Sequence, residues 1–317
     1  MRRYVLRRVV LALGSLFAVS VLVFLATVAL PGGAARAILG PTATPARVAA
    51  LTRSLHLNRP LFVQYGDWLA GLMTGHFGHS LANGRPVLSY LGPSLKDSFV
   101  LATSAIVISV PIAVLVGITA ARKARGVWAW GTTLGATFAA ALPEFVIGIL
   151  LIAVLATDVW HILPASSVVV GTGPPYHDVT TMILPVATLG LVVSPYIARN
   201  IQEAILAVRQ SDYIEYAVVN GHEPRLVWLR YIVPNALGPT LQVIAAEVAW
   251  IAGGIVLVEY VFDYPGIGTQ LVYAISNRDV PVVQFLTLLI GAVYVFGNLA
   301  ADLFAVILEP ATRAAIR

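Results

Sequence analysis

Residues 9–30 read VVLALGSLFAVSVLVFLATVAL, a run without charged residues that ends at Pro31-Gly32-Gly33. A helix that crosses a bilayer needs about 20 mostly apolar residues, so this run predicts a membrane-spanning helix. The composition agrees with it, because 58% of the 317 residues are hydrophobic and only 11% are charged. Soluble domains average about 25% charged residues. The chain is therefore predicted to be an integral membrane protein.

Five further apolar runs follow the first. They cover residues 98–121, 131–156, 182–201, 237–258 and 280–308. Each run is continuous rather than alternating, and each is longer than the roughly 9–11 residues of a membrane β-strand. We therefore predict an all-α membrane protein with six transmembrane helices.

The basic residues indicate how the helices are oriented. With the N-terminus in the cytoplasm, 13 of the 20 Lys and Arg residues fall in cytoplasmic segments. Six of the other seven lie in residues 31–97, a loop too long for the positive-inside rule to apply. We predict a multi-pass membrane protein with both termini in the cytoplasm. This placement explains the net charge of +5 without a nucleic-acid partner. Heavy use of Arg and Ala is typical of a GC-rich bacterial genome, so the membrane is expected to be a bacterial cytoplasmic membrane.

The predicted spans divide the chain into four parts. Residues 1–31 hold the cytoplasmic N-terminus and the first span, residues 32–97 form an external segment, residues 98–308 form a five-helix core, and residues 309–317 form a cytoplasmic tail. A cleaved signal peptide is the alternative for the first span, because that span has a basic start and Ala35-Arg36-Ala37 follows it. We expect an uncleaved anchor, since the apolar run is long for a signal peptide.

The external segment is predicted to contain two short helices. Residues 44–57 have the pattern of the first, and residues 60–73 have the pattern of an amphipathic second. In the second helix, Tyr65, Trp68 and Leu72 are available for the membrane interface, where aromatic side chains are enriched.

The cytoplasmic stretch between the fourth and fifth spans has the pattern of a short capped helix. It reads SDYIEYAVVNG over residues 211–221. Asp212 followed by Glu215 resembles a capping box, and both acids suit the positive end of a helix. Gly221 suits the position just after a helix end, where a left-handed backbone is favourable. Such a helix could pass the motion of a soluble partner to the bundle, or it could rest on the lipid headgroups.

The same stretch resembles the EAA loop of bacterial ABC importer permeases, here at residues 203–234. That loop has a glutamate, two alanines, a glycine and a distant proline, and Glu215, Ala217, Gly221 and Pro234 match at the right spacings. Departures from the pattern are Tyr216, Tyr231 and Val233. In the peptide and nickel branch of the family, Asp212-Tyr213-Ile214 also match, whereas Val218 and Asn220 replace a basic pair.

The resemblance covers nearly the whole chain. Residues 57–80, 235–239, 259–268 and 278–284 are similar to dipeptide and oligopeptide permeases of the first-subunit type, in the same order and on the same sides of the membrane. The resemblance implies the type I ABC importer permease fold. It also implies that the chain is the pore-forming subunit of a binding-protein-dependent, ATP-driven importer for dipeptides or oligopeptides.

Partners and site residues follow from the same resemblance. The implied partners are a second homologous permease, two cytoplasmic ABC ATPases that bind ATP and Mg²⁺, an external substrate-binding protein, and membrane lipids. The chain itself contains no Gly-Lys pair and hence no Walker A loop, so we expect it to bind no cofactor and to be no enzyme. The residues expected to couple to the ATPases are Asp212, Glu215, Tyr216, Ala217, Gly221 and Pro234.

The loop before the last span is predicted to lie at the outer mouth of the path, as a gate or a docking ledge. Its expected residues are Glu259, Phe262, Tyr264, Pro265, Gly266, Gly268, Arg278 and Asp279. Proline and glycine allow a tight re-entrant turn, and the aromatic side chains of Phe262 and Tyr264 could plug a narrow opening. The alternative is a surface loop held by an ion pair between Glu259 and Arg278.

Three acids interrupt the predicted spans: Glu144, Glu247 and Asp302. An acid at mid-bilayer costs about 2.5–3.5 kcal/mol on insertion scales, so each should face protein or water. We expect them along the translocation path, with Glu247 nearest the pore. The alternative is a hydrogen bond between helices, for example with Asn298 beside Asp302.

No pattern of catalytic or metal-ligating residues is apparent. His76 and His79 lack further partners at metal-ligand spacing, and there are no cysteines. Nickel complexes, haem and other small solutes remain alternative substrates. The rival class of function is an ATP-independent secondary transporter or channel, in which Glu247 and Asp302 would carry protons or ions.

Overall fold

The computed structural model describes residues 2–28, 39, 43–54, 58–123, 127–168 and 173–308. Within these ranges every regular element is helical, apart from an isolated bridge between His79 and Pro86. The predicted all-α fold is confirmed. The tail at 309–317 and the stretch 35–37 lie outside the described residues.

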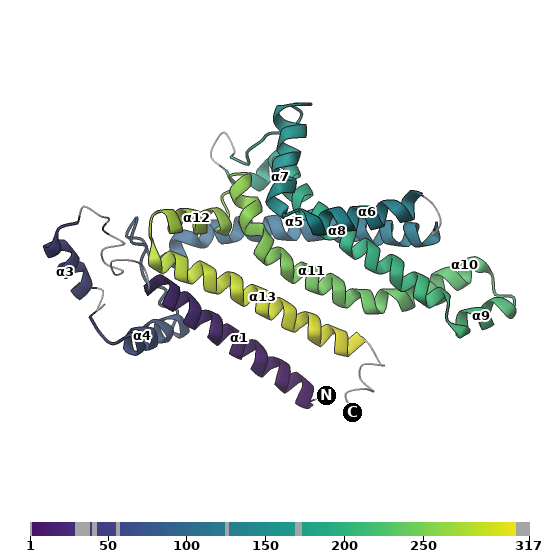
Figure 1. The fold of residues 1–317 in the computed structure, drawn as a ribbon, viewed down its shortest axis with the longest axis horizontal. Helices are drawn as coiled ribbons and strands as arrows, with labels where there is room; N and C mark the ends of the chain where they lie inside the picture. Colours follow the sequence, from purple (N-terminus) through teal and green to yellow (C-terminus); the bar gives the residue numbers. More distant parts are fainter. Residues whose placement is uncertain are drawn as a thin grey trace.

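Five helices in the described part are long and apolar enough to cross a membrane. They are α1 (Arg2–Val28), α5 (Val87–Arg122), α8 (Val179–Arg209), α11 (Val233–Val261) and α13 (Val280–Leu308). Figure 1 shows them running along the long axis of the molecule. The short helices α3 (Pro45–Ser54), α4 (Leu61–Met73) and α12 (Ile267–Ser276) lie toward one end, and α9 (Asp212–Val219) and α10 (Pro224–Leu226) lie toward the other.

The predicted span at 131–156 is broken rather than continuous. It consists of α6 (Val127–Ala141) and α7 (Glu144–Ile152), which continues as a π-helix through Thr157, and the two halves meet at an angle of 106°. Pro143 lies at the break. A proline removes a backbone donor and disfavours helical backbone in the residue before it, so the helix stops at this point.

Helix α8 lies at the centre of the bundle. It packs against α5, α6, α7 and α11. Of its most apolar 18-residue stretch, 61% is buried, whereas 28% or less of the corresponding stretch is buried in each of the other four long helices. Small residues let α5 and α8 approach closely, because a Cβ at Gly117 would stand 2.6 Å from the Ala198 carbonyl oxygen. The core of the fold is therefore built around α8.

Helix α1 packs antiparallel against α13. Arg8 and Asp302 form an ion pair of 2.6 Å near one end, and the Gln284 amide donates to the Thr27 hydroxyl at 2.7 Å near the other. The start of α1 and the end of α13 therefore lie on the same side of the bundle. Asp302 thus has a helix-to-helix partner, but that partner is Arg8; Asn298 donates instead to the Tyr294 carbonyl oxygen.

Helix α4 packs on the C-terminal half of α1. The Tyr65 and Trp68 rings lie 5.4 and 5.7 Å from the Phe24 ring, and the Tyr65 hydroxyl is 2.8 Å from the Ser20 hydroxyl. Both aromatic residues are thus used to attach α4 to the first span, while their availability for the membrane interface stays a prediction. The short helix predicted at 44–57 is confirmed as α3 over the described residues.

Candidate functional site

Helix α9 joins α8 to the segment that leads into α11. It runs from Asp212 to Val219 at one end of the bundle (Figure 1). Ile214 and Ala217 are three residues apart on one face, and both are buried against the core formed with α8 and the π-helix Val227–Ile232. The predicted short helix is confirmed, and it is fixed to the bundle rather than loose.

The N-terminal cap of α9 differs from the prediction. Ser211 is the N-cap residue, and its hydroxyl donates to the Val208 carbonyl oxygen at 2.5 Å instead of capping the helix. Asp212 and Glu215 lie in the first turn and make no side-chain cap. The predicted capping box is wrong, so these acids stabilise α9 only through the helix dipole.

The C-terminus of α9 is built as predicted. Gly221 has a φ of +75°, its N–H donates to the Val218 carbonyl oxygen at 3.0 Å, and the His222 N–H donates to the Ala217 carbonyl oxygen at 3.2 Å. This pair of bonds is the Schellman motif, which ends a helix with one residue in the left-handed region. The chain then reverses direction, and Pro234 stands in the first turn of α11.

The exposed side of α9 carries large apolar side chains beside the acids Asp212 and Glu215. Tyr213, Tyr216, Val218 and Val219 project from it, and Tyr216 and Val219 keep 73% and 79% of their surface accessible. Large apolar side chains gathered on an exposed surface mark a site for a protein partner or for the membrane surface. The arrangement can hold a docked soluble protein on one face while the other face stays packed on α8.

At the opposite end of the bundle, Glu259 ties three helices together. Its carboxylate is fully buried and accepts from the Ser98 hydroxyl of α5 and from the Gly268 N–H of α12 at 2.6 Å. The Ser98 hydroxyl also accepts from the Ile267 N–H at 2.8 Å. The alternative ion pair between Glu259 and Arg278 is therefore wrong, and nothing in the sequence pointed to Ser98.

Phe262 and Tyr264 lie inside the core beside this network. Both side chains are buried, and the Tyr264 hydroxyl donates to the Asp97 carbonyl oxygen at 2.9 Å. Burial raises the pKa of Tyr264, so its phenol keeps the proton that it donates. These two side chains thus fill space between helices rather than spanning an open mouth.

The predicted tight turn is present, but its glycines serve a different purpose. Neither Gly266 nor Gly268 has a positive φ. A Cβ at Gly266 would stand 2.2 Å from the Glu259 carboxyl carbon, and one at Gly268 would stand 2.4 Å from the Val256 Cα. The glycines are required for close approach of α12 to α11, while Pro265 starts the turn without packing as deeply.

Asp279 fastens the segment that precedes α5 to the start of α13. It is buried, and its carboxylate accepts from the Ser80 hydroxyl, from the Leu81 N–H at 3.0 Å and from the Ala82 N–H at 3.3 Å. Arg278 beside it adopts a φ of +56°. Of the predicted outer loop, Asp279 therefore holds the loop at 80–82 in place.

Asp279→Ala is expected to loosen this loop. Hydrogen bonds to a charged group contribute about 1.5–3 kcal/mol each, so the Leu81 and Ala82 amides should exchange with solvent at least roughly tenfold faster. Hydrogen exchange read by mass spectrometry on residues 76–86 checks this. The exposed acid Asp158 provides the control, and Asp158→Ala should leave the loop unchanged. Equal exchange in the Asp279 variant and the parent would contradict the assignment.

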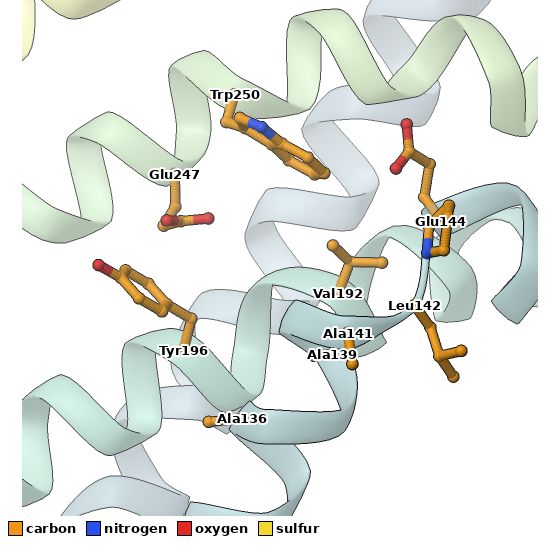
Figure 2. A pocket seen from close by; sticks show the side chains of 10 residues that line it. Ala136, Ala139, Ala141, Leu142, Glu144, Val192, Tyr196, Glu247 and Trp250 are labelled. Carbon is orange, nitrogen blue, oxygen red and sulfur yellow. The ribbon is translucent and has the colours of Figure 1, made fainter.

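The break between α6 and α7 borders a half-open cavity of about 380 Å³ between the helices. It is lined by Ala136, Ala139, Ala141, Leu142, Pro143, Glu144, Val192, Tyr196, Glu247 and Trp250. Figure 2 shows Glu247 and Trp250 projecting from α11, with Tyr196 facing them from α8 and Glu144 at the start of α7. Two of the three predicted acids are thus brought to one cavity, and Asp302 is not.

The cavity lies at mid-height of the spanning helices. Glu247 is the central residue of the 29-residue helix α11, so about 21 Å of helix separates it from each end. Trp250 lies three residues further on and shares its face. Sequence reasoning missed Tyr196 and Trp250, although the three-residue spacing from Glu247 would have indicated Trp250.

Comparison with known proteins identifies the family. Residues 113–314 match the family described as "binding-protein-dependent transport system inner membrane component". Residues 1–116 match the family that describes the N-terminal part of the same membrane components. A probable peptide ABC transporter permease protein, y4tP of Sinorhizobium fredii, is 36% identical over 98% of this chain and 99% of its own length. The glutathione transport system permease protein GsiC is 32% identical in both Salmonella typhimurium and Escherichia coli, over 99% of each chain. Since these matches extend from end to end, the chain belongs to the binding-protein-dependent transport system inner membrane component family and is an ABC importer permease.

Proposed function

We propose that this chain and a second homologous permease enclose the translocation path of an importer for dipeptides or oligopeptides. The family places the chain in the inner membrane as a permease that works with ATPase and substrate-binding components. The peptide substrate is supported by the names of the relatives, one a probable peptide permease and the other a glutathione permease. Glutathione is itself a small peptide.

The observation that carries the proposal is helix α9. Its exposed apolar face would seat in a cleft of a cytoplasmic ATPase, and its buried face, through Ile214 and Ala217, rests on α8 and on the π-helix before α11. Two partner ATPases would bind ATP and Mg²⁺, and their closure would move α9 as a rigid unit. Because α11 carries Glu247 and Trp250, this movement would reach the mid-membrane cavity.

Transport in this scheme makes and breaks no bond in the substrate. ATP binding shifts the population between an inward-facing and an outward-facing packing of the helices. The external binding protein would deliver substrate to the end of the bundle that carries α12 and the loop held by Asp279. The chain itself would hydrolyse no ATP.

The test is uptake of a radiolabelled dipeptide into proteoliposomes that contain the complete complex and its binding protein. We expect uptake that requires ATP and stops when a non-hydrolysable analogue replaces it. Glutathione and a tetrapeptide serve as competitors that define the substrate length. Dipeptide uptake that proceeds equally without ATP would establish a secondary transporter, and absence of any peptide uptake would exclude peptides as substrates.

The proposed orientation has both termini and α9 in the cytoplasm. Because the chain has no cysteine, single cysteines can report on sidedness. A membrane-impermeant maleimide added to intact cells should label cysteine at Asn83 and Asn277, but should label cysteine at Asn220 only after permeabilisation. Labelling at position 220 in intact cells would reverse the orientation.

A further inference from the structure

The residues that line the mid-membrane cavity include acids but no bases. Glu144 and Glu247 line it, and none of its lining residues is a lysine, arginine or histidine. Within the described part of the chain, neither carboxylate makes a hydrogen bond or an ion pair. By contrast, the carboxylate of Asp302 pairs with Arg8, and that of Glu259 accepts from the Gly268 N–H.

Two uncompensated carboxylates at this depth are costly. An ionised acid at mid-bilayer costs about 2.5–3.5 kcal/mol on insertion scales, and such residues normally pair or line a water-filled path. Since Glu247 is central in α11, it has no route to the headgroups along its own helix. Two carboxyl groups that have no protein partner among the described residues therefore face this space.

Aromatic rings border the same space. Tyr196 is 47% exposed and Trp250 is 37% exposed, so parts of both rings are free to meet a ligand. The Trp250 ring and a Glu144 carboxylate oxygen also lie close together, because both stand within 4 Å of the point that a Gly254 Cβ would occupy. The face of an aromatic ring attracts ammonium groups, most strongly when they are shielded from water.

We propose that this cavity is a subsite for an alkylammonium group of the transported solute, held by Glu144 and Glu247 and covered by Tyr196 and Trp250. Carboxylates supply opposite charge, and the rings exclude water and add a cation–π contact. The inference rests on the proposed function, because a free α-ammonium is the cationic group that small peptides carry. In this proposal the binding protein selects the substrate first, and Glu144 and Glu247 then select it by charge inside the membrane.

The first experiment measures the charge preference of the cavity without any peptide. A cysteine replaces Val192, which lines the cavity, in the otherwise cysteine-free chain of the assembled complex. Modification by a trimethylammonium methanethiosulfonate and by a sulfonate methanethiosulfonate is followed by mass spectrometry of this chain. The rate for each reagent is divided by the rate at which the same reagent modifies a free small thiol. We expect the cationic reagent to react about tenfold faster, a ratio that falls to about one in the Glu144→Gln/Glu247→Gln variant.

The control for this experiment is Glu203→Gln, an exposed acid on the same helix as Val192 that pairs with Arg199. It should leave the tenfold ratio unchanged. n-Butylammonium should also slow modification in the parent but not in the double Gln variant. A ratio near one in the parent, an unchanged ratio in the double variant, or a cysteine that none of the reagents reaches would each overturn the proposal.

The second experiment uses transport. Glu247→Gln should lower kcat/KM for dipeptide uptake by about five- to tenfold, whereas Glu247→Asp, which keeps the charge, should restore most of it. Dipeptide binding to the isolated binding protein should be the same throughout. Equal uptake by the Gln and Asp variants would overturn the proposal. If the parent complex takes up no peptide, the proposed function fails, while the cysteine experiment still decides the charge preference of the cavity.

Discussion

Gly268→Ala is expected to prevent the chain from accumulating as a folded protein in the membrane. A Cβ at this position would stand 2.4 Å from the Val256 Cα and 2.7 Å from its carbonyl oxygen. Both are backbone atoms of α11, so no side chain can rotate to make room. Forcing α12 away would also lengthen the bond from the Gly268 N–H to Glu259. Overpacking costs about 1–3 kcal/mol, and an unsatisfied buried acceptor costs about 1–3 kcal/mol more.

The measurement is the yield of monodisperse detergent-solubilised complex and its Tm. We expect either no recoverable protein or a Tm lowered by about 5 °C or more. Gly253→Ala is the matched control, because Gly253 lies in α11, the helix against which Gly268 packs, and a Cβ at Gly253 meets nothing within 4 Å. It should be neutral or slightly stabilising, since alanine favours helix over glycine. A Gly268→Ala protein as stable as Gly253→Ala would disprove the close packing of α12 on α11.

Gly221→Val is expected to abolish coupled transport while leaving the membrane bundle folded. The glycine has a φ of +75°, and a β-branched residue is a genuine outlier in that region. Nothing lies within 4 Å of a Cβ at Gly221, so the whole effect comes from backbone strain and not from a steric clash. The Schellman bonds of His222 and Gly221 would break, and α9 would lose its fixed angle to α10 and α11.

A graded series separates strain from other causes. Asparagine tolerates the left-handed region best among the non-glycine residues, alanine less, and valine least. Uptake per ATP hydrolysed, and the amount of ATPase retained on purification, should therefore fall in the order Gly, Asn, Ala, Val. Glu215→Lys should have a smaller effect than Gly221→Val, because Glu215 makes no cap and acts only through the helix dipole. Normal uptake and normal ATPase retention in Gly221→Val would show that α9 does not transmit the motion.

The sequence by itself determined the class of fold and the place of helix α9. Uncharged runs such as residues 9–30 leave the bilayer as the only suitable solvent, and hydrogen bonding within the run makes a helix the natural form. Helix α9 was predictable for a local reason as well. A helix end that needs left-handed backbone selects glycine, so Gly221 marks it within the sequence alone.

Only the tertiary structure decided which polar residues meet. Ser98 and Glu259 are 161 positions apart, and Ser80 and Asp279 are 199 positions apart, so nothing local in either partner predicts the contact. The same holds for the cavity, where Glu144 and Glu247 converge because α6 and α7 break at Pro143 and α8 brings Tyr196 against α11. A carboxylate in an apolar run indicates that a partner or water is needed, but which of the two it obtains depends on the packing of helices distant in sequence. That packing gave Asp302 an arginine on α1 and left Glu144 and Glu247 facing an open space.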